Sequence, residues 1–116
     1  MEEQPPWSVE FYATPRGTVP AEEYIASLSA TEQAVVLRYI DLLRQFGIGL
    51  REPTVKHIEG DLWELRPGPH RLFYFVFTGR RCIVLHGYRK KGMKAPGREI
   101  ARALRYMRDW LERERA

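Results

Sequence analysis

The alternation of apolar and polar positions predicts where the strands lie. Trp7 to Tyr12 (WSVEFY) alternates and is predicted to form a first strand. Later in the chain, three strand-like segments follow one another closely, at Leu62 to Arg66, Arg71 to Phe77 and Cys82 to Tyr88. Their connections, Pro67-Gly68-Pro69 and Thr78-Gly79, are short enough for antiparallel hairpins. The loop-like residues 48–61 leave room for one further short strand at Val55 to Ile58.

Helical periodicity occupies the rest of the chain. Pro20 opens a short helix to Leu28, because proline is tolerated in the first helical turn. Ser29 followed by Glu32 is a capping-box pattern, and it predicts a second helix that runs to about Phe46, where Gly47 ends it. Pro96 opens a final helix. Its apolar stripe is formed by Ile100, Leu104, Met107 and Leu111, and Arg98, Arg102 and Arg105 lie off that stripe.

The order of these elements is strand, two helices, a meander of strands and a last helix. It predicts a single α+β domain over residues 1–116, with helices covering one face of an antiparallel sheet. A chain of 116 residues fits one domain and can bury a core without a disulfide. The one cysteine, Cys82, and the absence of a signal-peptide pattern in Met1 to Pro6 favour a cytoplasmic protein with no membrane segment.

Charge is distributed unevenly along the chain. Residues 1–79 carry 7 Lys/Arg and 11 Asp/Glu, whereas residues 80–116 carry 12 Lys/Arg and 4 Asp/Glu, which gives net charges of −4 and +8. A basic segment of this kind is typical of proteins that bind polyanions, because phosphate contacts release counterions. An arginine-rich, solvated helix face would give the same charge pattern without any ligand.

Strand alternation indicates which side chains share a face. Trp63 and Leu65 are expected on one face, together with Ile83 and Leu85. The opposite face is expected to carry mainly polar and aromatic groups, namely Glu64, Arg66, Val84, His86, Tyr88 and Lys90. The central strand, His70 to Phe77, is apolar on both sides except for Arg71 at its start.

These residue types match what RNA cleavage requires. His86 or Glu64 could take the proton from a 2′-hydroxyl group, and a histidine could also protonate the leaving 5′-oxygen. The cations Arg66, Arg71, Lys90 and Lys91 could bind the scissile phosphate, and Tyr88 could stack on a base. No metal or other cofactor is called for, because three histidines and one cysteine show no recognised ligand spacing. Equally, His86 could be a structural residue and Glu64 with Arg66 a cross-strand ion pair.

The segments LWELRPGPHRLFYF (62–75), IVLHGYRKKGMKAP (83–96) and REIARAL (98–104) together resemble the phage Gp49-like branch of the RelE/HigB toxin superfamily. The resemblance covers most of residues 18–112. It implies a ribosome-dependent mRNA endonuclease, neutralised by a helix-turn-helix antitoxin, with the RelE-like α+β fold. It also implies catalytic roles for Glu64, Arg71, His86, Lys90 and Lys91. RNA contacts are expected from Arg66, Tyr88, Arg89, Lys94 and Arg98.

The same fold hosts ParE-like toxins, which inhibit DNA gyrase and cut no RNA, so fold alone does not decide the activity. A non-catalytic nucleic-acid-binding module and a protein that only binds a partner are further alternatives. The grouping of His86, Glu64 and the two lysines on one predicted face favours the nuclease.

Overall fold

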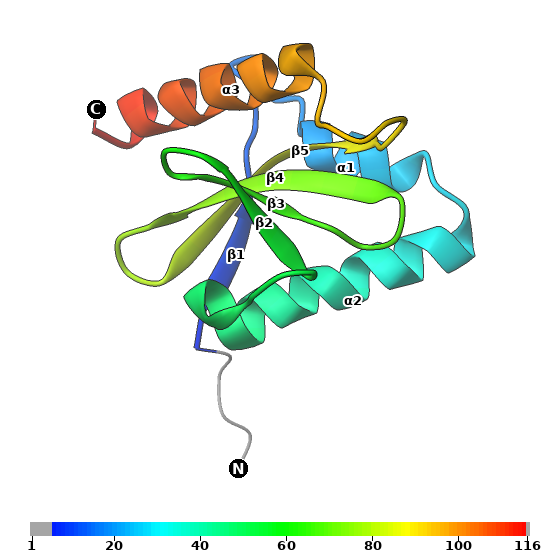
Figure 1. The fold of residues 1–116 in the computed structure, drawn as a ribbon. Helices are drawn as coiled ribbons and strands as arrows, with labels where there is room; N and C mark the ends of the chain where they lie inside the picture. Colours follow the sequence, from blue (N-terminus) through cyan, green and yellow to red (C-terminus); the bar gives the residue numbers. More distant parts are fainter. Residues whose placement is uncertain (1–5, 116) are drawn as a thin grey trace.

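The computed structural model describes residues 6–115, so the expectation about the N-terminal segment lies largely outside the described residues. Every predicted helix and strand is present (Figure 1). The elements are β1 (Ser8–Phe11), α1 (Pro20–Ala26), α2 (Ala30–Phe46), the 3-10 turn η1 (Gly47–Gly49), β2 (Val55–Glu59), β3 (Leu62–Leu65), β4 (His70–Phe77), β5 (Arg81–Arg89) and α3 (Gly97–Arg115). No helix in this part of the chain is long and apolar enough to span a membrane.

Local signals explain the limits of α2. The Ser29 hydroxyl accepts a hydrogen bond from the Glu32 backbone N–H at 3.2 Å, which confirms the predicted cap. At the other end, Gly47 has φ +46°, a conformation that favours glycine. A Cβ at this position would also lie 2.2 Å from the ring of Trp7, the residue before β1, so the close packing of Trp7 on the end of α2 requires glycine there.

The five strands form one sheet in the order β1-β5-β4-β3-β2. β2, β3, β4 and β5 are antiparallel neighbours, and β1 adds to the far side of β5 in parallel. The sheet is therefore mixed, because the N-terminal strand pairs in parallel with β5 instead of joining the antiparallel meander. β5, the strand that leads into the basic segment, lies between β1 and β4 and is buried along most of its length.

Helices cover both faces of the sheet, so the prediction of a single covered face was wrong. The α1–α2 hairpin packs on one face and α3 on the other (Figure 1). The physical reason lies in β4 and β5, whose apolar side chains point both ways and need two coverings. Leu72, Tyr74, Cys82 and Val84 face the helical hairpin, and Phe73, Phe75, Ile83 and Leu85 face α3.

A bulge in β5 changes the predicted faces. Phe73 pairs with His86 but Tyr74 pairs with Val84, so Leu85 is an extra residue in the strand. Val84 therefore faces the hairpin, whereas Ile83, Leu85 and His86 all lie on the α3 side. The expectation that Ile83 and Leu85 share a face with Leu65 was wrong for this reason. Simple alternation cannot indicate a bulge, because it assumes one side-chain reversal per residue.

Candidate active site

Three neighbouring strands bring a carboxylate, a phenol and two guanidinium groups together. Glu64 of β3 is only 3% exposed. Its Oε2 accepts a hydrogen bond from the Tyr88 hydroxyl of β5 at 2.9 Å. Its Oε1 lies 3.6 Å from Nε of Arg66 and 3.8 Å from Nε of Arg71. We call these four residues the Glu64 cluster. The prediction that Glu64 and Tyr88 share a face is confirmed.

Arg71 is fixed within the cluster by its own strand. Its Nη1 donates to the carbonyl oxygens of Gly68 at 2.7 Å and His70 at 2.8 Å. Arg71 lies directly opposite Tyr88 in the β4–β5 register. Burial, followed by the nearby charge of Arg66, lowers the pKa of Arg71 from its ordinary value, although Glu64 acts in the opposite direction. The guanidinium therefore has a defined position, held through its Nη1 group.

The other two members of the cluster are a protonated phenol, Tyr88, and a partly exposed guanidinium, Arg66. Burial, reinforced by the negative charge of Glu64, raises the pKa of the Tyr88 phenol, which keeps it protonated at neutral pH. The Arg66 side chain is 22% exposed, the largest exposure in the cluster. Its Nε is buried and makes no hydrogen bond within residues 6–115. Arg66 is therefore the member of the cluster that solvent, or an anion, reaches most readily.

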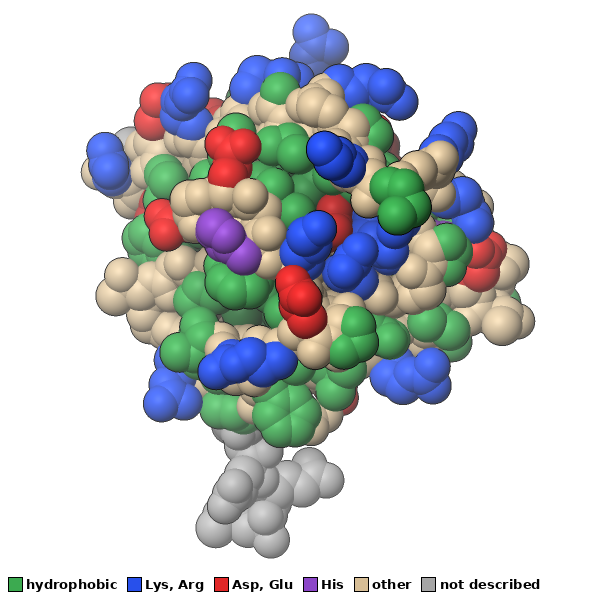
Figure 2. Space-filling view, in the orientation of Figure 1, with side chains coloured by type: hydrophobic (Ala, Val, Ile, Leu, Met, Phe, Trp, Pro, Cys, Tyr) green, Lys and Arg blue, Asp and Glu red, His purple; other side chains and the backbone are tan. Residues whose placement is uncertain are grey.

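A basic loop adjoins the Glu64 cluster. Lys90 is partly buried and follows Tyr88 by two residues, and its backbone N–H donates to the Pro69 carbonyl at 2.8 Å. Beyond it Lys91, Lys94 and Arg98 are exposed, and within the described chain none of these four side chains forms an ion pair. Figure 2 shows basic side chains gathered near the middle of one face of the molecule, with acidic side chains beside them.

His86 lies on the same face of the sheet as Glu64 but beneath α3. It is 2% exposed, its Nε2 donates to Glu99 of α3 at 3.1 Å, and its ring packs edge-on to Tyr106. Burial lowers the pKa of His86 from 6.5, although Glu99 opposes the shift. The ring thus faces α3 and not the basic loop. Its predicted role as a proton carrier stays a prediction, and a covered position favours a packing role.

Two contacts were not foreseen from sequence, one on each face of the sheet. Glu99 was not among the predicted residues, because an acidic residue in the first turn of a helix is explained by the helix dipole alone. Arg89, expected to contact RNA, donates to Glu32 of α2 at 2.7 Å on the opposite side of the sheet, and its RNA contact stays a prediction. Sequence spacing cannot indicate the contact between Arg89 and Glu32, since these residues are 57 positions apart.

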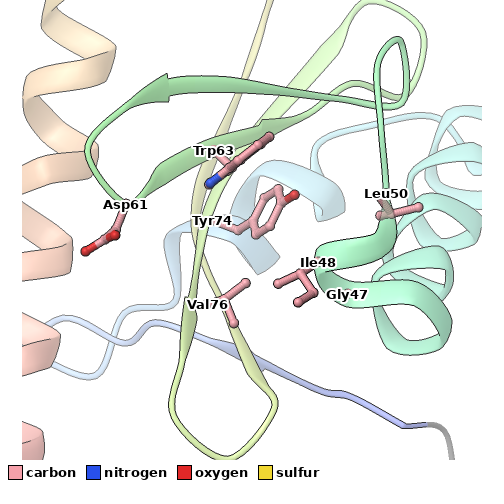
Figure 3. A pocket seen from close by; sticks show the side chains of 7 residues that line it. All are labelled: Gly47, Ile48, Leu50, Asp61, Trp63, Tyr74 and Val76. Carbon is pink, nitrogen blue, oxygen red and sulfur yellow. The ribbon is translucent and has the colours of Figure 1, made fainter.

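An apolar cavity of about 120 Å³ lies on the other face of the sheet, beside η1 (Figure 3). Trp63, Tyr74 and Val76 line it from the sheet, and Gly47, Ile48 and Leu50 line it from the end of the hairpin. Asp61 is its one carboxylate. It contains no member of the Glu64 cluster, so we do not assign the chemistry to it. Nowhere between residues 6 and 115 do three His, Cys, Asp or Glu side chains converge as metal ligands would.

Comparisons with known proteins place the chain in a structural context. Residues 23–108 match a family described as phage-derived, Gp49-like proteins. Among solved structures, the RelE–RelB complex of Pyrococcus horikoshii is 20% identical with a TM-score of 0.60, covering 76% of this chain and 99% of that one. A search of curated proteins found no match.

Two bacterial structures give the same picture. The isolated RelE toxin of E. coli is 15% identical with a TM-score of 0.52, covering 83% of this chain and 97% of that one. The toxin–antitoxin complex RelBE2 of Mycobacterium tuberculosis is 22% identical with a TM-score of 0.50, covering 73% and 99%. At these identities the likeness shows the fold, and it confirms the predicted RelE-like architecture with its C-terminal helix.

Proposed function

The chain belongs to the phage-derived Gp49-like family and has the RelE fold, and on this premise we propose that it is the toxin of a toxin–antitoxin pair and cleaves mRNA. The observation that carries the proposal is the Glu64 cluster beside an unpaired basic loop. A carboxylate, a phenol and several cations next to one another can supply the base, the acid and the charge stabilisation that metal-independent RNA cleavage requires.

The proposed reaction transfers a phosphoryl group within the RNA, from the 5′-oxygen to the neighbouring 2′-oxygen. The 2′-oxygen attacks the adjacent phosphorus, the bond to the 5′-oxygen breaks, and a cyclic phosphate and a free 5′-hydroxyl group result. Tyr88 donates its hydrogen bond to Glu64, so it can pass a proton to that carboxylate while it accepts one from the 2′-hydroxyl. We therefore assign the base to Glu64 acting through Tyr88, with His86 as the alternative.

Cations bind the phosphate, stabilise developing charge and supply a proton in this scheme. Arg66 and Lys90 lie nearest the surface of the site and would meet the scissile phosphate first, and Arg71 stabilises the charge that develops on the phosphorane. An ammonium group of Lys90 or Lys91 protonates the leaving 5′-oxygen. Lys94 and Arg98 extend the basic surface along the RNA backbone.

The partners in this proposal are mRNA on the ribosome and a helix-turn-helix antitoxin, and the setting is the cytoplasm. The printed descriptions of two structural neighbours name a RelE–RelB complex and a toxin–antitoxin complex, which supports a protein partner for this chain as well. The basic segment of residues 80–116 suggests that the antitoxin contributes an acidic segment, by charge complementarity.

An in vitro translation reaction followed by primer extension tests this function. Wild-type protein should leave defined cuts in the translated mRNA, and Tyr88→Phe, which removes only the hydroxyl, should reduce cutting by about a hundredfold. Arg38→Gln is the matched control, because Arg38 is exposed on α2 away from the cluster. Translation arrest or growth arrest without any cut RNA would overturn the nuclease, and inhibited DNA supercoiling would then point to the ParE-like alternative.

A further inference from the structure

A second polar network lies on the opposite face of the sheet from the Glu64 cluster. His70, at the start of β4, is 1% exposed, and both of its ring nitrogens are hydrogen-bonded. Its Nε2 lies 3.0 Å from Glu32 Oε1 of α2, and its Nδ1 lies 2.6 Å from the Tyr24 hydroxyl of α1. The same Glu32 oxygen accepts from Arg89 of β5 at 2.7 Å. We call Tyr24, Glu32, His70 and Arg89 the hairpin clasp.

The clasp is built with defined geometry. With Nε2 donating to the Glu32 carboxylate, Nδ1 of His70 accepts a hydrogen bond from the Tyr24 hydroxyl. Glu32 also receives a hydrogen bond from the Ser29 hydroxyl at 3.2 Å and lies in the first turn of α2, where the helix dipole favours a negative charge. Tyr24 packs over Gly87, where a Cβ would lie 2.7 Å from the ring. Four separate elements, α1, α2, β4 and β5, therefore meet at one carboxylate and one imidazole.

The clasp is connected to the candidate active site through the backbone. His70 and Arg89 are directly opposite each other in the β4–β5 register. The His70 carbonyl oxygen accepts a hydrogen bond from Nη1 of Arg71 at 2.8 Å, and Lys90, the residue after Arg89, donates its N–H to Pro69. Each strand thus carries a clasp residue immediately followed by a cation that the proposed mechanism uses.

We propose that His70 and Glu32 are positioning residues: by fixing the ends of β4 and β5 to the helical hairpin, they set the positions of Arg71 and Lys90 at the scissile phosphate. This inference rests on the proposed function. It assigns Arg89 to the clasp instead of to the RNA, because its guanidinium is already paired with Glu32. A displacement of about 1 Å at a catalytic group can cost about a hundredfold in rate, so a contact made on the far side of the sheet can control the reaction.

The variants are chosen to take the clasp apart stepwise. His70→Ala removes both ring contacts, and Tyr24→Phe removes one hydroxyl. His70→Gln places an amide N–H near the position of Nε2 and so keeps a donor for Glu32. His57→Ala is the matched control, because His57 is exposed on β2 and, within residues 6–115, its ring hydrogen-bonds the Gly60 carbonyl oxygen and packs edge-on to Trp63, with no contact to the clasp.

Two readouts separate positioning from mere stability. The ¹H–¹⁵N signals of Arg71 Nε–H and of the Lys90 backbone amide report the surroundings of these two groups, and they can be recorded whether or not the protein cuts RNA. Single-turnover cleavage of saturating RNA on ribosomes reports the reaction. We expect His70→Ala to shift both signals and to slow cleavage by at least about tenfold while RNA affinity stays within about twofold, and we expect His70→Gln to recover most of the rate. His57→Ala should match wild type.

The outcomes are distinguishable. If folded His70→Ala leaves the Arg71 and Lys90 signals and the rate unchanged, the clasp is a structural contact only and the inference is overturned. If His70→Ala fails to fold, Tyr24→Phe carries the same test, because it removes a single oxygen. If wild type cuts no RNA, the proposed function fails, while displaced Arg71 and Lys90 signals in His70→Ala would still establish the mechanical connection and unmoved signals would refute it.

Discussion

Replacing His86 by glutamine separates the two roles that this histidine could have. The ring is buried under α3, with Nε2 donating to Glu99 and Nδ1 making no hydrogen bond within the described residues. A glutamine amide places an N–H near the position of Nε2 and can keep the bond to Glu99, but it cannot carry a proton between groups near neutral pH. His86→Gln therefore removes the acid–base chemistry and spares much of the packing.

The structure sets the size of the expected stability loss. The imidazole contacts Phe73 and Tyr106, with ring centroids 5.3 and 5.6 Å away. Each such aromatic contact contributes about 0.5–1.5 kcal/mol beyond area burial, so losing both lowers the free energy of unfolding by about 1–3 kcal/mol. A domain of this size has a stability of about 5–15 kcal/mol, so the variant stays folded.

The expected catalytic effect is small by comparison. If Glu64 is the base, His86→Gln should cut RNA within about threefold of wild type, whereas Glu64→Gln should lose about a hundredfold or more. A loss of a hundredfold corresponds to about 2.7 kcal/mol of transition-state stabilisation.

Urea denaturation measures the first effect, and single-turnover cleavage at a temperature where both variants are folded measures the second. A folded His86→Gln protein that cleaves a hundredfold more slowly, with Glu64→Gln near normal, would refute this reasoning and make His86 the proton carrier.

Three further predictions test particular contacts. Gly87→Ala should lower the free energy of unfolding by about 1–3 kcal/mol, because its Cβ would lie 2.7 Å from the Tyr24 ring, and Tyr24→Ala in the same chain should relieve most of that loss in urea denaturation. Burial lowers the pKa of folded His86 below 6.5, so on acidification the unfolded chain takes up a proton that the folded chain does not. The free energy of unfolding should therefore fall as the pH drops below about 6.5. Denaturation curves at several pH values should show this fall in wild type, and His86→Gln should lack the part that His86 contributes. Lys90→Gln should reduce the salt slope of RNA binding by about one unit, whereas Arg89→Gln should not, because Arg89 is paired with Glu32; equal slopes for both variants would contradict this assignment.

The helices could be predicted because their signals are local. Ser29 with Glu32, Pro20 and Gly47 each act within one turn of the residue concerned, and all three work in the structure as the sequence indicated. The second covering of the sheet was also present in the sequence, in the central strand that is apolar on both sides. A strand of that kind needs a layer on each face, which α3 provides.

In the candidate site, too, the residues placed by local signals could be predicted and the contacts between distant residues could not. Glu64 and Tyr88 could be placed together because alternation within each strand decides their face. The bulge in β5 lies before His86, so the alternation from His86 to Tyr88 is unaffected. Glu32 and Glu99 could not be assigned in the same way. Each is an acidic residue in the first turn of a helix, where the dipole already accounts for it, and its histidine partner becomes a neighbour only when the sheet and helices assemble.

The structure also explains how a modest net charge yields a strongly basic surface. Three of the four acidic side chains in residues 80–116 bind inward or to a neighbouring element: Glu99 accepts from His86, Asp109 from Tyr12, and Glu114 from Arg81. Their charges are used in contacts that fix α3 to the sheet.

Several arginines of α3 remain exposed without an ion pair within residues 6–115, namely Arg98, Arg105 and Arg108. The potential outside this helix is therefore more positive than the overall charge of +4 implies, and that potential continues from the basic loop beside the Glu64 cluster. A polyanion approaching this face meets unpaired cations first. Under the proposed function, an RNA backbone and an acidic antitoxin segment would both be attracted to this surface and would compete for it.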